Sequence, residues 1–279
     1  FVFNTASHIY LIDRKGNNVE GFPIKLKAKA ITPVCVANYD NKRNYRLVIT
    51  CENNRIYNYT ITGKPTKGWN HNKAKDPTSK GFQHFSVSGK DYFVTAESNG
   101  KVHLLDRRGK NRVKVGKRLE NFSNQPLQVF VGKNASSSSI FATDTMGLLY
   151  RVSLKGKVSS IKLASMSSKH NFLVSDLDGD QKPELIFNDL NLLTIYDDKY
   201  QKLHERRLSP ESQGPFEVYL GSEKYGIGLY NVANGEILLL DKELNPISGF
   251  PQTGYSSFDL SERSESGKTK LIAVAGENS

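Results

Sequence analysis

A short pattern of hydrophobic and polar positions recurs six times along the chain, at a spacing of 44 to 47 residues. Each copy has five residues of alternating, β-branched or aromatic character, then a small polar residue, and glycine closes the first four copies. The copies begin at His8, Arg55, Lys101, Leu148, Leu192 and Glu236, and their polar sixth positions are Asp13, Thr60, Asp106, Ser153, Asp197 and Asp241. This pattern predicts a strand that runs into a tight turn, because Asp, Ser and Gly tolerate turn geometry.

The spacing of the copies predicts the fold class. A period in the forties with several short strands per unit is typical of a β-propeller, in which each unit buries its hydrophobic faces against its neighbours. We therefore expect an all-β fold, a β-propeller of six or seven four-stranded blades in a single domain over residues 1–279. The expected repeats cover about 1–29, 30–77, 82–118, 125–163, 169–208, 214–250 and 255–279. The first repeat lacks an innermost strand and the last supplies only two strands, so the blade count stays open.

The composition limits the classes of protein to which the chain can belong. Hydrophobic residues make up 37% of it, the mean hydropathy is −0.50, and no run approaches the roughly 18 apolar residues of a membrane helix. The chain starts at Phe1 inside a strand-like segment without an initiator Met, which indicates a fragment of a longer protein. Cys35 and Cys51 are too few for a disulfide framework, so we expect two buried core residues, with a bond between adjacent strands as the alternative.

Positive charge is concentrated in the first part of the chain. The net charge is +11, yet residues 1–120 hold 23 Lys/Arg and 9 Asp/Glu, whereas residues 121–279 hold 16 and 19. The segment Lys101–Arg118 alone has eight basic residues. It predicts either a solvated outer strand and turn or a docking patch for an acidic protein partner, formed by Arg107, Arg108, Lys110 and Arg112. Nucleic acid is the weaker prediction, because the basic residues alternate with strand residues and not with exposed aromatic rings.

One acidic loop has the spacing of a cation site. Carboxylates stand at its positions 1, 3, 5 and 9 and a backbone carbonyl at position 7, namely Asp176, Asp178, Asp180, Glu184 and the carbonyl of Lys182. Several carboxylate oxygens and a carbonyl converging from one loop form the arrangement that Ca²⁺ prefers. The alternative is a hydrogen-bonded turn that only joins two strands.

The same loop carries a family resemblance. DLDGDQKPELIF from Asp176 resembles the DLDGDGKPEL loop of FG-GAP/VCBS-type repeats, the integrin-α-like propeller family. Gly-Phe-Pro segments, at Gly21–Pro23 and Gly249–Pro251, also recur in bacterial members of that class, and NGKVHLLDRRGK from Asn99 resembles quinoprotein-like propeller repeats. The resemblance implies a bound Ca²⁺ and an extracytoplasmic bacterial setting: periplasmic, outer-membrane-associated or secreted. Gln181 replaces the glycine at position 6 of the family loop, which predicts a more strained loop or a weaker metal site.

The sequence gives little support for catalysis. The six histidines are scattered without a metal-ligand spacing, and the chain has no GxSxG elbow, P-loop or GxGxxG before a helix. We therefore expect no catalytic residues, no cofactor apart from Ca²⁺, and a non-enzymatic scaffold or protein-interaction module of a bacterial cell-envelope or secreted protein. The alternatives are a quinoprotein-type enzyme, disfavoured because Trp69 is the only tryptophan, and a structural component of a larger assembly that docks through its basic half.

Overall fold

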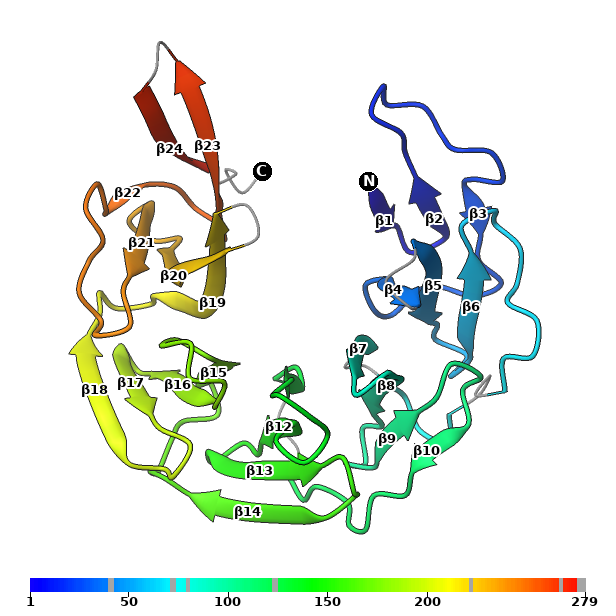
Figure 1. The fold of residues 1–279 in the computed structure, drawn as a ribbon, viewed down its shortest axis with the longest axis horizontal. Helices are drawn as coiled ribbons and strands as arrows, with labels where there is room; N and C mark the ends of the chain where they lie inside the picture. The colour runs from blue at the N-terminus through cyan, green and yellow to red at the C-terminus, as the bar shows by residue number, and fades with distance from the viewer. Residues whose placement is uncertain are drawn as a thin grey trace. The chain divides into compact units, whose positions relative to one another are not determined.

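The structure is a computed structural model that describes residues 1–39, 43–70, 74–78, 81–121, 125–220, 223–265 and 268–274. These residues form strands and turns without a helix, and none of them belongs to a helix long and apolar enough to cross a membrane. The chain divides into two compact units, unit 1 (Phe1–Lys162) and unit 2 (Leu163–Ser279). Figure 1 labels the strands along the chain.

Unit 1 contains four antiparallel sheets, each made of strands that follow one another in sequence. Sheet 1 is β1 (Val2–Asn4), β2 (His8–Leu11) and β3 (Ile24–Lys25), and sheet 2 is β4 (Cys35–Tyr39), β5 (Asn44–Thr50) and β6 (Ile56–Thr60). Sheet 3 is β7 (Gln83–Val87), β8 (Lys90–Ala96), β9 (Val102–Leu105) and β10 (Asn111–Val113). Sheet 4 is β11 (Gln128–Phe130), β12 (Ser139–Thr143), β13 (Leu148–Ser153) and β14 (Val158–Lys162).

Unit 2 contains two sheets. Sheet 5 is β15 (Asn171–Ser175), β16 (Glu184–Asp189), β17 (Leu192–Tyr196) and β18 (Lys202–Arg207). Sheet 6 is β19 (Gln213–Leu220), β20 (Glu223–Asn231), β21 (Glu236–Leu240), β22 (Gln252–Thr253), β23 (Asp259–Glu265) and β24 (Lys268–Val274). The β23–β24 hairpin joins β19 through one parallel bridge, between Leu220 and Leu260, so the last two expected repeats share a sheet.

The six repeated segments occupy equivalent strands, as the sequence predicts. Five of them form the third strand of their repeat, namely β6, β9, β13, β17 and β21 (Figure 1). The first copy forms β2, the middle strand of a three-stranded sheet, because the first repeat has no innermost strand. The described residues thus form an all-β fold with six sheets, three of the repeats being regular four-stranded meanders and a fourth, β19–β22, continuing into the last hairpin.

Sheet 2 differs from the expectation of four strands. The segment before Gly68 and Trp69 contributes only an isolated bridge, between Tyr59 and Pro65, to the described part of this sheet. The N–H of Thr66 still donates to the carbonyl of Asn58 at 2.7 Å, and in the described residues no strand follows it in this sheet. The indole Nε1 of Trp69 instead donates a hydrogen bond to the carbonyl of Ile56 at 3.2 Å and covers the edge of β6.

Consecutive sheets within each unit pack face to face. Leu47 and Ile49 of β5 lie in the core shared with sheet 1, whereas Val48 between them lies in the core shared with sheet 3. Sheets 3 and 4 share a third core, and sheets 5 and 6 a fourth. Strand β5 is apolar on both faces where Leu47, Val48 and Ile49 are buried, while the outer strand β18 has only exposed and half-buried positions. The two thiols follow the same division, since Cys35 packs on one face of sheet 2 and Cys51 on the other, and both are free.

The connector between β10 and β11 is fastened to the turns of sheets 3 and 4. The backbone N–H of Leu119 donates to the carbonyl of Gly100 at 2.9 Å, and that of Thr145 donates to the carbonyl of Asn121 at 3.2 Å. Gly100 has a φ of +79°, and a Cβ atom there would lie 1.9 Å from the carbonyl oxygen of Leu119. The approach of turn and connector therefore requires glycine at this position.

We predict that Gly100→Ala destabilises the protein far more than Gly89→Ala. Gly89 also has a positive φ, +69°, but no atom lies within 4 Å of a Cβ built there. Gly89→Ala should lower the free energy of unfolding by about 1–2 kcal/mol, because alanine disfavours the left-handed conformation. Gly100→Ala should lower it by at least about 2 kcal/mol more, because its Cβ would also clash with the backbone. Urea denaturation measures both free energies of unfolding, and equal losses would contradict the fastened connector.

Candidate functional site

The acidic loop between β15 and β16 closes on itself through its own carboxylates. Oδ1 of Asp176 accepts the N–H of Gly179 at 2.8 Å, and its Oδ2 accepts the N–H of Gln181 at 3.1 Å. Oδ1 of Asp178 accepts the N–H of Asp180 at 3.0 Å. Such local bonds are the reason that Asp favours tight turns. Gln181 has a φ of +66°, which explains why glycine suits this position and why glutamine strains it.

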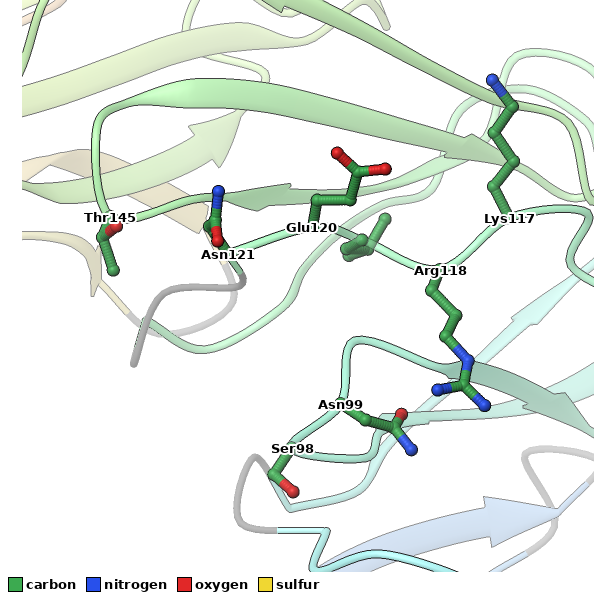
Figure 2. Close-up of a pocket in the computed structure, with 8 residues that line it drawn as sticks. Ser98, Asn99, Lys117, Arg118, Glu120, Asn121 and Thr145 are labelled. Carbon is green, nitrogen blue, oxygen red and sulfur yellow. The ribbon is translucent and has the colours of Figure 1, made fainter.

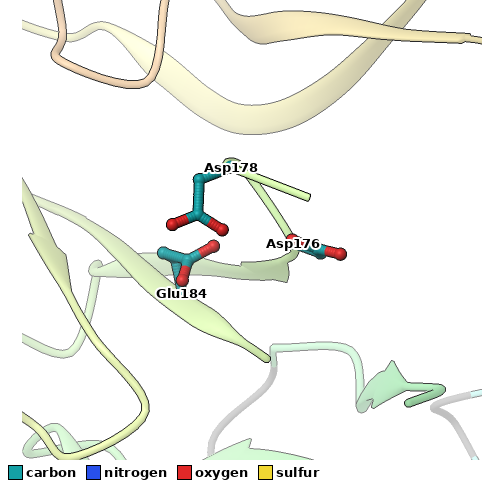
Figure 3. A group of neighbouring side chains, drawn as sticks. All are labelled: Asp176, Asp178 and Glu184. Atoms are coloured by element: carbon teal, nitrogen blue, oxygen red, sulfur yellow. The ribbon is translucent and has the colours of Figure 1, made fainter. Parts of the chain in front are cut away.

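The loop brings three of the four predicted carboxylates together. Asp176, Asp178 and Glu184 each offer an oxygen, and these oxygens lie within 4.8 Å of one another (Figure 3). Ca²⁺ binds oxygen at 2.3–2.6 Å, so two of its ligands can be separated by about 5 Å at most. The donor set consists of oxygen alone, and its spacing fits a Ca²⁺ ion. Asp176, Asp178 and Glu184 are therefore the residues that could hold the metal.

Glu184 is the buried member of this acidic cluster. Its side chain is only 6% exposed, and Oε2 accepts the N–H of Leu177 at 2.7 Å. Burial, together with the nearby charges of Asp178, Asp180 and Asp176, raises the pKa of Glu184 to about 7. A bound divalent ion would offset both the burial of the Glu184 carboxylate and the negative charge around it.

Asp180 lies outside the cluster. Its carboxylate pairs with the ammonium of Lys182 at 2.6 Å and accepts the backbone N–H of the same residue at 2.7 Å. The hydrogen bond from the Lys182 side chain lowers the pKa of Asp180 and raises that of Lys182. The spacing of the sequence thus predicts five ligands, while the structure groups three side chains and pairs Asp180 with Lys182.

Two cavities in unit 2 adjoin the loop. One of ≈ 400 Å³ is lined by Asp176 and by Asp241 and Glu243 of the turn after β21. A smaller one of ≈ 130 Å³ is lined by Asp178, Glu184, His204 and Lys242, among others. Sequence reasoning did not connect the Asp241–Glu243 turn with the loop, because the two segments come from different sheets.

The predicted docking patch divides into two kinds of residue. Arg107 pairs with the carboxylate of Asp91, and its guanidinium lies 5.0 Å from the ring centre of Tyr39. Arg112 donates from Nε to the carbonyl of Asp91 at 3.0 Å and lies over the ring of Tyr92. Both arginines therefore bind the protein's own sheet 3. Arg108 and Lys110 are exposed in the β9–β10 turn and keep their charges available to a partner.

Asp91 is the centre of a buried polar network that the sequence did not reveal. Its Oδ1 lies 2.8 Å from Nε2 of His84 and 2.6 Å from Oγ of Ser86, and Asp91 itself is 3% exposed. Ser86 and Asp91 face each other in the β7–β8 hairpin. The tight turn at Ser88 and Gly89 is the sequence signal that could have predicted this pair. Both His84 and Ser86 bind the carboxylate, so this group lacks the serine–histidine bond of an activated nucleophile.

A second buried pair lies in the same sheet. Nε2 of His103 is 2.7 Å from Oε1 of Glu97, and the side chains are 5% and 1% exposed. Lys101 adds a weaker contact to the same carboxylate at 3.9 Å. Sheet 3 therefore buries two carboxylates, and each is bonded to a histidine and lies beside a cationic side chain, Arg107 for Asp91 and Lys101 for Glu97.

An open pocket lies where the β10–β11 connector meets the turns of sheets 3 and 4. It measures ≈ 930 Å³, and we call it the connector pocket (Figure 2). Its lining residues are Ser98, Asn99, Lys117, Arg118, Leu119, Glu120, Asn121 and Thr145. Figure 2 shows Arg118 extending from the connector toward Asn99, with Asn121 on the side nearer Thr145. Sequence reasoning missed this pocket because its residues come from three separate segments.

Comparison with known proteins supports the fold. No protein-family model matches the chain, and no curated protein matches its sequence. The crystal structure of BBS1N in complex with ARL6DN, from a lead soak, matches with a TM-score of 0.62 and 14% identity over 99% of this chain and 87% of that one. The mercury-soaked crystal gives a TM-score of 0.60 and 15% identity over 82% and 71%.

An enzyme matches as well. A catalytically inactive virginiamycin B lyase from Staphylococcus aureus, crystallised with quinupristin, gives a TM-score of 0.57 and 12% identity over 87% of this chain and 83% of that one. These structures are β-propeller-type folds, so the chain has a fold of the β-propeller type. At such low identity the likeness shows the fold alone.

The buried network of sheet 3 predicts how stability depends on pH. Burial lowers the pKa of His84, while hydrogen bonds from Ser86, His84 and Arg107 lower the pKa of Asp91 despite its burial. The bond from His103 likewise lowers the pKa of Glu97. All three groups bind protons more weakly in the folded chain, so their contribution is complete above about pH 6.5. It falls first as unfolded His84 titrates and then, below about pH 4.5, with the two carboxylates.

The test compares two variants, Glu184→Gln alone and Glu184→Gln with Asp91→Asn, by denaturant unfolding from pH 8 to pH 4. Glu184→Gln is present in both because the raised pKa of Glu184 gives a contribution to stability of opposite sign, which is lost as the pH rises toward 7. Asp91→Asn should lower the free energy of unfolding at pH 7 by about 2–3 kcal/mol and make its decline with acid shallower. An unchanged pH profile would contradict the network.

Proposed function

We propose that the chain is a non-enzymatic β-propeller module that binds an acidic partner protein through unit 1. The single observation that carries this proposal is the separation of charge between the two units. Unit 1 holds 28 Lys/Arg and 10 Asp/Glu, a net charge of +18, whereas unit 2 holds 11 and 18, a net charge of −7. Fields of this size steer the approach of an oppositely charged protein.

The placement of polar groups favours binding over catalysis. The two buried histidine–carboxylate pairs of sheet 3 lie inside the sheet packing, at 9% side-chain exposure or less. Their carboxylates are already bonded to arginine, serine or lysine neighbours, which is the pattern of a structural network. By contrast, Arg108 and Lys110 are exposed in the β9–β10 turn, which suits a surface that meets a partner.

The fold comparison and the sequence resemblance complete the proposal. BBS1N was crystallised in complex with a protein, ARL6DN, which shows that a propeller of this type can serve protein recognition. We propose that the chain belongs to the FG-GAP/VCBS-like and quinoprotein-like propellers of bacterial cell-envelope or secreted proteins, on the basis of the Asp176–Glu184 loop and of the strand pattern from Asn99. We also propose that both units form one propeller domain, since the BBS1N match extends over 99% of the chain.

Reversal of Arg108 and Lys110 to Glu should slow binding to the partner captured from the native host. Exposed charges mainly control the association rate, so we expect that rate to fall about tenfold at low salt while the dissociation rate changes little. Raising the ionic strength past roughly 0.15 M should slow the wild type in the same way. Surface plasmon resonance measures both rates.

The control for this experiment is Lys202→Glu, an exposed change in unit 2. Lys202 pairs with Glu205 at 2.8 Å on the outer strand β18, so its replacement removes positive charge from the other unit. We expect little effect on association. An association rate that is independent of salt and of both Arg108 and Lys110 would refute the proposed function.

We propose in addition that the acidic loop binds Ca²⁺ and that the ion stabilises unit 2. The proposal is supported by the oxygen spacing of Asp176, Asp178 and Glu184 and by the raised pKa of Glu184. A cation held by two Asp residues and the first residue of β16 would tie the loop to sheet 5. The ion would thus act on the rigidity of the loop and not on a reaction.

Calcium should raise the melting temperature of the wild type. A ligand at about 100 times its dissociation constant stabilises by about 2.7 kcal/mol, which corresponds to a rise on the order of 5 °C or more for a chain of this size. Asp178→Asn should abolish the rise. Asp180→Asn should retain it, because Asp180 pairs with Lys182. Loss of the response in both variants would assign Asp180 to the ion, and no response in the wild type would reduce the loop to a turn.

A further inference from the structure

The connector pocket is built from three segments that the backbone holds in place. Its floor is Leu119, which is 2% exposed and bonded to Gly100, and its side near Thr145 is fixed by the bond to Asn121. One more backbone bond, from Gly116 to Gly156 at 2.9 Å, brings the β13–β14 turn beside the connector. A pocket fixed in this way needs little reorganisation when a ligand binds.

The chemistry of the pocket is cationic. Lys117 and Arg118 are exposed, and in the described part of the chain neither has an ion-pair partner, in contrast to Arg107. The Gly116–Gly156 bond also places Lys155 and Lys157, both exposed, in the turn beside the connector. Glu120 is the single acidic residue among the lining residues. The guanidinium of Arg118 thus retains donors for a carboxylate, which arginine can bind in bidentate fashion.

The equivalent position in unit 2 has a different chemistry. There a pocket of ≈ 720 Å³ lies between the β16–β17 and β20–β21 turns and is bordered by the β18–β19 connector. Amide and aliphatic side chains dominate it, including Asn188, Leu190 and Val232, and its two charged residues, Lys169 and Glu211, are of opposite sign. The positive charge of the connector pocket therefore does not follow from its place in the fold.

We infer that the connector pocket binds an acidic peptide segment, rich in Asp or Glu, of the partner protein. This inference rests on the proposed function and adds a specific site to it. The volume of ≈ 930 Å³ lies within the range of ligand pockets and accommodates a few residues. Ser98, Asn121 and Thr145 supply hydroxyl and amide groups for the peptide backbone. A nucleic acid is disfavoured because no lining residue within the described part of the chain has an aromatic ring on which a base could stack.

The test measures binding of a fluorescein-labelled hexaglutamate peptide to the full chain by fluorescence anisotropy, with hexaglutamine as the neutral probe. The wild type should bind hexaglutamate at least about tenfold more tightly than hexaglutamine at low salt. Lys117→Glu with Arg118→Glu should lower that affinity about tenfold or more. Ser98→Trp fills the pocket without changing the charge and should lower it at least about fivefold.

The matched control has the same change in charge elsewhere in unit 1. Lys64→Glu with Lys67→Glu alters the exposed turn after β6, and neither lysine is among the lining residues of the connector pocket. We expect this variant to lose less than about threefold in affinity, because a peptide bound in the pocket makes no contact with either lysine. Each variant must keep the wild-type melting temperature, and Thr145→Trp replaces Ser98→Trp if the latter unfolds.

Two results would overturn the inference. Equal losses in both charge-reversal variants, with full binding by the tryptophan variants, would show a diffuse charge effect, and the proposed function would remain. Tighter binding of a hexathymidine oligonucleotide than of hexaglutamate, lost on changing Lys117 and Arg118, would assign the pocket to nucleic acid. A salt-independent association rate with the captured partner would instead contradict the proposed function, so the experiments distinguish the failure of one proposal from the failure of the other.

Discussion

Burial of each sheet between its neighbours is the constraint on which the rest of the structure depends. Within a unit, a central strand such as β5 gives alternate residues to two different cores, so both of its faces must be apolar. Each fully buried Leu, Ile or Val side chain contributes about 1.5–3 kcal/mol. A carboxylate is costly to bury in such a core unless its partners are buried with it, and Asp91 and Glu97 of sheet 3 are both bonded to buried neighbours.

Because of the same constraint, side chains can differ between repeats mainly in the turns and connectors. Strand sequences are restricted by packing, whereas the connector from Lys114 to Asn121 is held by its backbone bonds and gives only Val115 and Leu119 to the core. Its side chains can therefore carry charge without a cost to the core. Equivalent connectors in the two units have different side chains, cationic in unit 1 and largely amide or aliphatic in unit 2. This difference links the charge separation of the units to a specific surface.

The repeat architecture could be predicted from the sequence because strand packing leaves a periodic signal. The six repeated segments, the missing inner strand of the first repeat and the final pair of strands all have local patterns of apolar and turn residues. The described residues do not form the fourth strand expected in sheet 2, where Trp69 instead bonds to the edge strand β6. The pattern of strand-forming residues in the sequence does not indicate that a side chain, and not another strand, will lie at the edge of the sheet.

The sites were less predictable because they depend on distances between segments. The spacing of the acidic loop predicts that its carboxylates lie close together, and those of Asp176, Asp178 and Glu184 do. The carboxylate of Asp180 instead pairs with Lys182, and the spacing alone does not indicate which of the two arrangements forms. The basic segment reads as one patch in sequence. In the structure it includes two arginines that bind sheet 3, Lys101 near Glu97, two exposed residues at one turn, the exposed Lys114 and two more residues at the connector pocket. The last five are exposed to a partner.

Hydrogen–deuterium exchange of the chain with and without its captured partner tests the central claim, that unit 1 is the binding unit, most directly. The account predicts slower exchange on binding in residues 98–101 and 114–121, where backbone bonds join the β8–β9 turn to the connector. The equivalent β16–β17 turn and residues 208–213 of unit 2 should be unchanged. Slower exchange confined to unit 2, with residues 98–101 and 114–121 unaffected, would contradict it.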